Sequence, residues 1–180
     1  HGLGSFERPV PLPGGGTGVA AFSTVAFEPA EVPRGTVFMC QHKTRDTVWL
    51  PELLSHANTA CGLAEIVAIS DEPEVEAPRF ARLWADGSVS ARGMGQVVQT
   101  GENSAPLVLM PRDALAKEFP GIDLSQTAQG AFTVLRVKVA DPDAARGCLD
   151  SGGVPAIDTA NGVAVAPEHA SGVIVEFVPA

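Results

Sequence analysis

The sequence contains no tyrosine, and aromatic residues make up only 6% of its 180 residues. Such a composition disfavours a pocket built from stacked aromatic rings. Basic residues are also scarce: 12 Lys and Arg stand against 21 Asp and Glu, so the net charge is −9. A surface that binds nucleic acid needs clustered cations, and a membrane helix needs roughly 20 consecutive apolar residues. Neither feature is present, so we expect neither a nucleic-acid nor a membrane partner.

The sequence has three cysteines, Cys40, Cys61 and Cys148, and no CxxC pair. This pattern supports neither a zinc knuckle nor a dithiol redox site. We expect these cysteines to be small buried apolar residues of a reducing compartment, which predicts a cytoplasmic location.

The first third of the chain predicts a hairpin. Residues 1–16 have the composition of a loop, whereas residues 19–27 and 36–42 are rich in β-branched and aromatic residues, as strands are. Residues 43–61 predict a polar linker with helical turns, held by four apolar anchors: Trp49, Leu50, Leu53 and Leu54.

The remainder predicts the same order of elements twice. The first copy has a strand, a helix that starts at Pro73, two short strands and a connecting helix; these are 63–70, 71–85, 96–100, 106–110 and 113–119. The second copy has a strand, a helix that starts at Pro142 and two short strands; these are 134–139, 141–150, 163–166 and 173–178. Pro73 and Pro142 are 142 − 73 = 69 residues apart, and Pro111 and Pro179 are 179 − 111 = 68 apart. Two pairs of prolines separated by nearly the same number of residues indicate an internal duplication.

The first of these helices should carry one apolar stripe. Its members recur at spacings of three and four: Val75, Arg79, Phe80, Leu83 and Trp84. In the second helix, the corresponding inward face consists of Ala145, Cys148 and Leu149.

Four segments carry a recognisable pattern: Cys40–His42 (CQH), Trp49–Glu52 (WLPE), residues 56–65 (HANTACGLAE) and Gly172–Phe177 (GVIVEF). They resemble the corresponding segments of bacterial glyoxalase-like domain proteins of the vicinal-oxygen-chelate superfamily. The resemblance implies an α+β fold in which paired βαβββ modules form half-open, cup-shaped sheets.

Relatives of this type carry four such modules in two pairs, which implies a division of this chain. Residues 1–42 would be the last strands of a preceding partial module, 43–61 a linker, and 62–180 a glyoxalase-like domain with modules 62–121 and 130–180. We therefore expect that further modules precede His1 in the natural protein. The exposed sheet edges of a partial module also predict a homodimer.

The resemblance implies metal ligands on the first and last strands of each module. In this chain the first-strand positions hold Glu65 and Val134, and the last-strand positions hold Leu107 or Val108 and Glu176. Two carboxylates fall short of the three protein ligands of an enzyme metal site. We therefore predict no metal ligand here, although the superfamily commonly binds a divalent cation.

Glu65 and Glu176 are the candidate catalytic residues. If both face one cup, desolvation and mutual repulsion should raise at least one of their pKa values, as a general acid or base requires. Arg136 lies two residues after Val134, so it shares that strand face. It is a candidate substrate-binding residue, or it neutralises Glu176 in an ion pair that lines a vestigial pocket.

The resemblance region supplies three more candidate substrate-binding residues: His42, His56 and Asn58. Each has a structural alternative, because an isolated histidine commonly serves as a hydrogen-bonded structural residue and Asn58 can form an Asx-turn. The glycine-rich segment 13–18 precedes no helix, so it is not a phosphate-binding loop.

Three functions stay open at this point. The first is an enzyme of glyoxalase type, a lyase, isomerase or dioxygenase that acts on a small oxygenated substrate. The second is a metal-free protein that binds a small molecule, as resistance-type members of the superfamily do. The third is a degenerate half that supports an active half of a longer chain.

Overall fold

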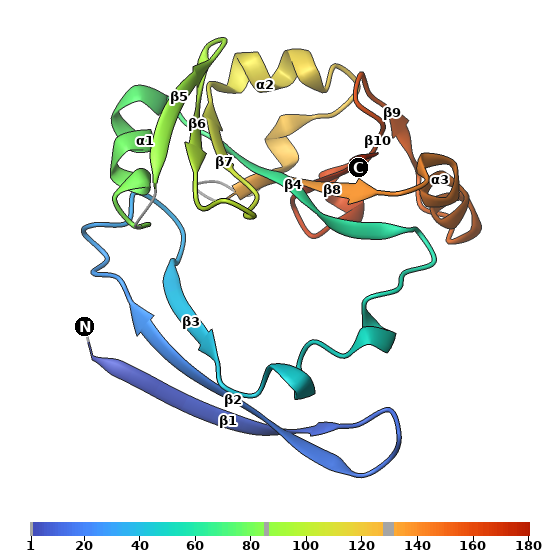
Figure 1. Ribbon diagram of the computed structural model, residues 1–180. Coiled ribbons are helices and arrows are strands. Elements are labelled where there is room, and N and C mark those ends of the chain that lie inside the picture. The colour runs from blue at the N-terminus through green and yellow to red at the C-terminus, as the bar shows by residue number, and fades with distance from the viewer. Residues whose placement is uncertain (1, 85–86, 128–131) are drawn as a thin grey trace. The chain divides into compact units, whose positions relative to one another are not determined.

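The chain folds as two compact units, which are described separately here (Figure 1). The smaller unit comprises residues 1–32 and 36–55, and the larger comprises residues 33–35 and 56–180. The computed structural model describes the whole chain except residues 1, 85–86 and 128–131.

The smaller unit is a three-stranded antiparallel sheet in the order β1-β2-β3. Its strands are β1 (Leu3–Pro11), β2 (Thr17–Ala26) and β3 (Phe38–His42), followed by short 3₁₀ turns at Arg45–Thr47 and Pro51–Leu53. The predicted pairing of residues 19–27 with 36–42 is confirmed. The predicted loop over residues 1–16 is wrong for Leu3–Pro11, which form β1, whereas residues 12–16 form the turn that follows.

The missed strand β1 contains Pro9 and Pro11, which have no backbone N–H to donate. β1 is an edge strand, and only there can a sheet accommodate such residues readily. The glycine-rich segment forms the turn into β2, where Gly15 and Gly16 adopt φ values of 89° and 84°. That left-handed backbone favours glycine, so the segment serves to reverse the chain.

The larger unit contains two βαβββ modules joined by a connector (Figure 1). The first module is β4 (Ala60–Ile69), α1 (Pro73–Ala81), β5 (Ser88–Arg92), β6 (Gly95–Gln99) and β7 (Leu107–Met110). The connector holds α2 (Arg112–Glu118) and a 3₁₀ turn at Leu124–Gln126. The second module is β8 (Phe132–Val139), α3 (Pro142–Ser151), β9 (Ile157–Asp158), β10 (Val163–Val165), a 3₁₀ turn at Pro167–His169 and β11 (Ile174–Pro179).

Both modules contribute to one eight-stranded sheet with the order β5-β6-β7-β4-β8-β11-β10-β9. The two first strands, β4 and β8, pair antiparallel at the centre, and each is flanked by the last strand of its own module in parallel. The arrangement reads the same from either edge, as a duplication predicts. The expected fold class, α+β with paired βαβββ modules, is confirmed.

The helices begin where local chemistry favours a helix start. Pro73 and Pro142 occupy the first turn, in which a missing N–H costs nothing. Before α3, the Asp141 carboxylate accepts hydrogen bonds from the N–H groups of Asp143 and Ala144, at 2.9 and 3.1 Å.

The connector covers one face of the sheet with apolar side chains. Leu115 of α2 and Phe119 after it pack against Val67, Val108 and Val134, from β4, β7 and β8. Ala145 of α3 packs in a separate cluster with Val163, Val165 and Phe177. The connector therefore fills part of the concave face of the sheet with apolar side chains. Polar groups on this face lie beside that apolar cluster.

Several predicted inward-facing residues lie at the surface. Val75 of α1 is 56% exposed, whereas Phe80 and Leu83 of the predicted stripe are buried, and Ala77 and Ala81 complete the buried face. Among the linker anchors, Trp49, Leu53 and Leu54 are exposed at 49%, 60% and 54%. The expectation of buried cysteines also fails, since Cys40 and Cys61 are exposed and Cys148 is half-buried.

No helix among the described residues is both long and apolar enough to cross a bilayer.

Two substitutions in α1 test which residues face its core. We expect Phe80→Ala, at a fully buried position, to lower the free energy of unfolding by about 3–5 kcal/mol. Val75→Ala, at an exposed position of the same helix, should change it by no more than about 0.5 kcal/mol. Urea titration of both variants measures the difference, and equal losses would contradict the assigned helix face.

Candidate functional site

Five charged side chains meet on the face of the sheet that the connector covers. Arg136 of β8 lies in the middle, and its guanidinium forms ion pairs with three carboxylates. Its Nη1 donates to Glu65 of β4, Nη2 to Glu118 of α2, and Nε to Glu176 of β11. The strand register explains the convergence, because Arg136 pairs with Glu65 on one side and with Glu176 on the other.

Two further donors complete the cluster. Arg92, at the end of β5, forms a bidentate pair with Glu65, with Nη1 to Oε2 at 2.7 Å and Nη2 to Oε1 at 3.1 Å. The Thr159 hydroxyl donates to Oε1 of Glu176 at 2.6 Å. Both carboxylates on the sheet are thereby held by donors on more than one oxygen.

The centre of this cluster is buried. Glu176 is 0% exposed, Arg136 7% and Glu65 9%. Taking such charges out of water costs several kcal/mol per ion unless each has a well-placed partner. The Arg136 guanidinium also lies 5.7 Å from the centre of the Phe119 ring, where the π electrons add a favourable interaction.

The electrostatics keep the carboxylate of Glu65 ionised. Burial is the largest single influence and raises its pKa, but the hydrogen bonds and charges of Arg92 and Arg136 together bring the pKa below its ordinary value. Burial lowers the pKa of Arg136, and its bonds to Glu118 and Glu176 more than reverse that effect. The expectation of a raised carboxylate pKa is therefore wrong for Glu65, because the arginines outweigh desolvation.

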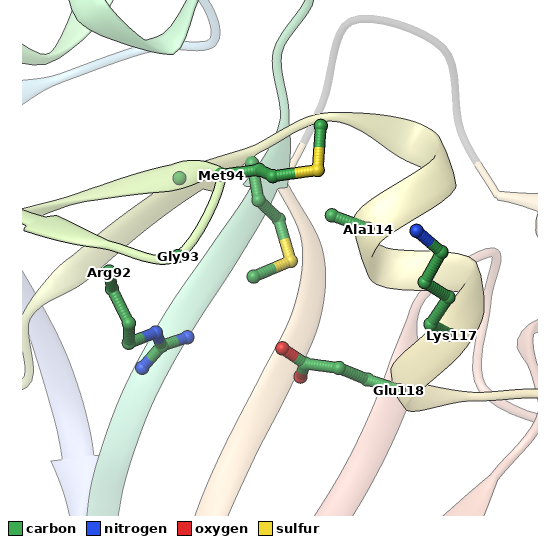
Figure 2. A pocket seen from close by; sticks show the side chains of 8 residues that line it. Arg92, Gly93, Met94, Ala114, Lys117 and Glu118 are labelled. Atoms are coloured by element: carbon green, nitrogen blue, oxygen red, sulfur yellow. The ribbon is translucent and has the colours of Figure 1, made fainter.

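Two open hollows adjoin the cluster and share Arg92, Lys117 and Glu118; together they are called the groove below. The first, of about 370 Å³, is closed by apolar and small residues: Gly93, Met94, Gly95, Met110 and Ala114 (Figure 2). The second, of about 400 Å³, adds Arg136, Ala160 and Asn161. The groove thus has an apolar end and a charged, polar end.

A tight hairpin carries one wall of the groove. Gly93 and Met94 form the two-residue connection between β5 and β6, and Gly93 adopts a φ of 58°. A Cβ at Gly95 would lie 2.6 Å from the backbone oxygen of Leu109, so only glycine allows β6 this close to β7. Figure 2 shows Arg92 and Met94 on this hairpin and Ala114, Lys117 and Glu118 on α2.

The comparisons with known proteins agree with this architecture. Residues 1–84 match the family model of the glyoxalase-like domain. The structure of methylmalonyl-CoA epimerase from Mycobacterium tuberculosis has a similar fold, with a TM-score of 0.50, 20% identity and coverage of 69% of this chain and 96% of that one. The glyoxalase-like domain is thus matched over residues 1–84, and the larger unit has the paired-module fold that the resemblance to the vicinal-oxygen-chelate superfamily implied.

A hypothetical protein from Staphylococcus aureus aligns with 99% of this chain and with 57% of its own, at 8% identity and a TM-score of 0.55. No curated protein sequence matches. The structural likenesses, at such low identity, establish the fold and leave substrate and reaction open.

The divalent cation that this superfamily implies does not fit the residues present. In the other module, the position equivalent to Glu65 holds Val134 and the position equivalent to Glu176 holds Val108. Both valines lack a ligand atom and are buried in the apolar core. The carboxylates that remain accept N–H groups of Arg136, whose positive charge would repel an added cation. Among the residues that the structure describes, no group of three or more His, Cys, Asp or Glu is arranged to hold a metal.

The predicted site residues fall into two sets. Glu65, Arg136 and Glu176 do come together. Of the remainder, His42 belongs to the smaller unit, where Nδ1 accepts the Trp49 Nε1–H at 3.1 Å and the ring contacts Phe22.

His56 and Asn58 begin the larger unit and are not among the described residues that line the groove. His56 is exposed, and the Asn58 side chain accepts the N–H of Ala60 at 3.2 Å, which is the predicted Asx-turn. Substrate binding by His42, His56 and Asn58 stays a prediction without support from this geometry.

Sequence reasoning missed Arg92, Lys117 and Glu118. Arg92 lies on β5, an exposed edge strand whose sequence lacks the apolar pattern of a buried strand, so the strand itself was not predicted. The positions of Lys117 and Glu118 follow from how the connector helix α2 lies over the sheet. A glycine directly after Arg92 marks a turn, but nothing local shows which residue the turn brings near Glu65.

Removing the central cation should weaken the dependence of stability on pH in the acid range. In the native protein the lowered pKa of Glu65 gives stability that is present above its unfolded pKa of about 4.3 and is lost as the pH falls through the lower folded value. In Arg136→Met, Glu65 keeps Arg92 but loses its second cationic partner, so its folded pKa should rise towards the unfolded value. The loss of stability on acidification should then be smaller than in the native protein.

At pH 7 we expect Arg136→Met to cost roughly 3–5 kcal/mol of unfolding free energy, since it leaves buried charge uncompensated. Lys138→Met, at an exposed position two residues further along β8, is the matched control and should cost little. Denaturant titrations between pH 4 and 8 measure both effects. A variant whose stability profile runs parallel to that of the native protein would refute the role of Arg136.

Proposed function

We propose that the larger unit is a metal-free domain that binds a small organic molecule in the groove. The observation that carries this proposal is the position of Arg136. Its guanidinium lies between the strands that bear Glu65 and Glu176 and provides there the positive charge that a metal ion would otherwise provide. The groove beside it is then free to take a ligand by shape and charge, with no coordination required.

The dimensions and lining of the groove support this function. Each hollow, at about 370 and 400 Å³, lies within the range of roughly 300–1,000 Å³ typical of small-molecule sites. The lining combines apolar groups such as Met94, Met110 and Ala114 with a few charged groups. Such a combination holds a ligand by its apolar part and orients it by its polar part.

The enzyme alternative, a lyase, isomerase or dioxygenase, has less support. One solved structure of similar fold is that of an epimerase, but the likeness to it is one of fold. The two candidate catalytic carboxylates, Glu65 and Glu176, are not among the described residues that line either hollow. Glu65 is also held as a carboxylate of lowered pKa, which makes it a poor proton acceptor at neutral pH.

A steric block tests the proposed function. Ala114 lines the groove, whereas Ala116 of the same helix is exposed and is not among the lining residues. We expect Ala114→Phe to fill the apolar end and abolish ligand binding, and Ala116→Phe to leave binding intact. Thermal shifts of the native protein and both variants with a panel of small acids, amides, alcohols and amines, in the presence of EDTA, measure this.

A compound present at about 100 times its Kd should stabilise the native protein by roughly 2.7 kcal/mol. Two results would contradict the proposal: no compound stabilises the native protein, or stabilisation requires an added divalent metal. Equal responses of Ala114→Phe and Ala116→Phe would place any ligand outside the groove.

A further inference from the structure

We infer that the groove selects a monocarboxylate that carries a short apolar chain. This inference rests on the proposed function and names the class of ligand. It follows from which charges line the groove, how far their hydrogen-bonding capacity is already used, and where the apolar end lies.

The described charges that line the groove are mostly positive. Arg92, Lys117 and Arg136 contribute three cations, and Glu118 contributes one carboxylate. Glu65 and Glu176 lie behind the two arginines, with side-chain exposures of 11% and 0%. A ligand therefore meets N–H donors first, which favours an anion over a cation or a neutral molecule.

Two of these cations have donors to spare. Lys117 is exposed and makes no ion pair among the residues that the structure describes, so its ammonium group can bind a ligand oxygen. The Arg92 side chain is 39% exposed and uses one N–H on each of Nη1 and Nη2 for Glu65. A guanidinium has five N–H groups, so Arg92 can hold Glu65 and a ligand carboxylate together.

The apolar end accounts for the chain of the ligand. Met94, Met110 and Ala114 face the same hollow as Arg92 and Lys117 (Figure 2). Met94 is 56% exposed, so contact with an apolar chain would remove its surface from water. Methionine side chains adapt their shape, which suits chains that differ slightly in length or branching.

A single negative charge suits the site better than several. Glu118 lines both hollows, and its carboxylate repels a ligand with a second anionic group close by. The whole chain carries a net charge of −9, which further disfavours a polyanion.

Isothermal titration of the native protein with three probes of equal chain length tests this inference: hexanoate, hexanamide and hexylammonium, all with EDTA. We expect hexanoate to bind at least about tenfold more tightly than either other probe, because it alone brings an anion to the cations Arg92 and Lys117, whereas hexanamide is neutral and hexylammonium is repelled by them. Its affinity should fall as the salt concentration rises, since the cations are partly exposed.

Lys117→Gln should weaken hexanoate about tenfold and hexanamide much less, because only hexanoate loses a hydrogen bond in which both partners are charged. Lys138→Gln removes the same charge from an exposed residue that is not among those lining the groove, and it should leave both affinities unchanged.

The possible failures are distinguishable. Hexanamide binding as tightly as hexanoate, with both lost in Ala114→Phe, would overturn the ligand class and leave the proposed function standing. Equal effects of Lys117→Gln and Lys138→Gln would also overturn it. Failure of all three probes, together with a flat response to the wider panel, would overturn the proposed function as well.

Discussion

One guanidinium holds the centre of the larger unit together. Arg136 pairs with Glu65 from the first module, Glu118 from the connector and Glu176 from its own module. Breaking any such buried pair leaves a charge without compensation, so the cluster favours one register of β4, β8 and β11 over shifted alternatives. The apolar core supplies most of the stability around it, because the connector packs Leu115 and Phe119 against both modules.

The same interaction determines what chemistry is open to the site. Carboxylates that already accept N–H groups are poor metal ligands and poor bases, and the residues that face the groove are instead arginine, lysine and methionine. The fold matches the one that the superfamily resemblance implied, yet its central polar groups stabilise the protein. Under the proposed function, ligand recognition falls to the residues that line the groove. The homodimer, the cytoplasmic location and the preceding modules stay predictions.

Much of the larger unit could be predicted because its signals are local: prolines at helix starts, strand-length apolar runs and a repeated spacing of landmarks. The Arg136–Glu176 pair was also predictable, since residues two apart share a strand face. Other features depend on tertiary placement. Pro9 and Pro11 disguise β1 because their acceptability depends on its being an edge. Val75 fits the helical period but faces away from the core, and Glu118 reaches Arg136 only through the path of the connector.

The central claim is that Arg136 and the buried carboxylates depend on one another. A double-mutant cycle measures this directly, from the unfolding free energies of the native protein, Arg136→Met, Glu176→Gln and the double variant at pH 7. The account predicts that the double variant loses much less than the sum of the single losses, with a coupling energy of about 2 kcal/mol or more. Losses that simply add, with a coupling energy near zero, would contradict it.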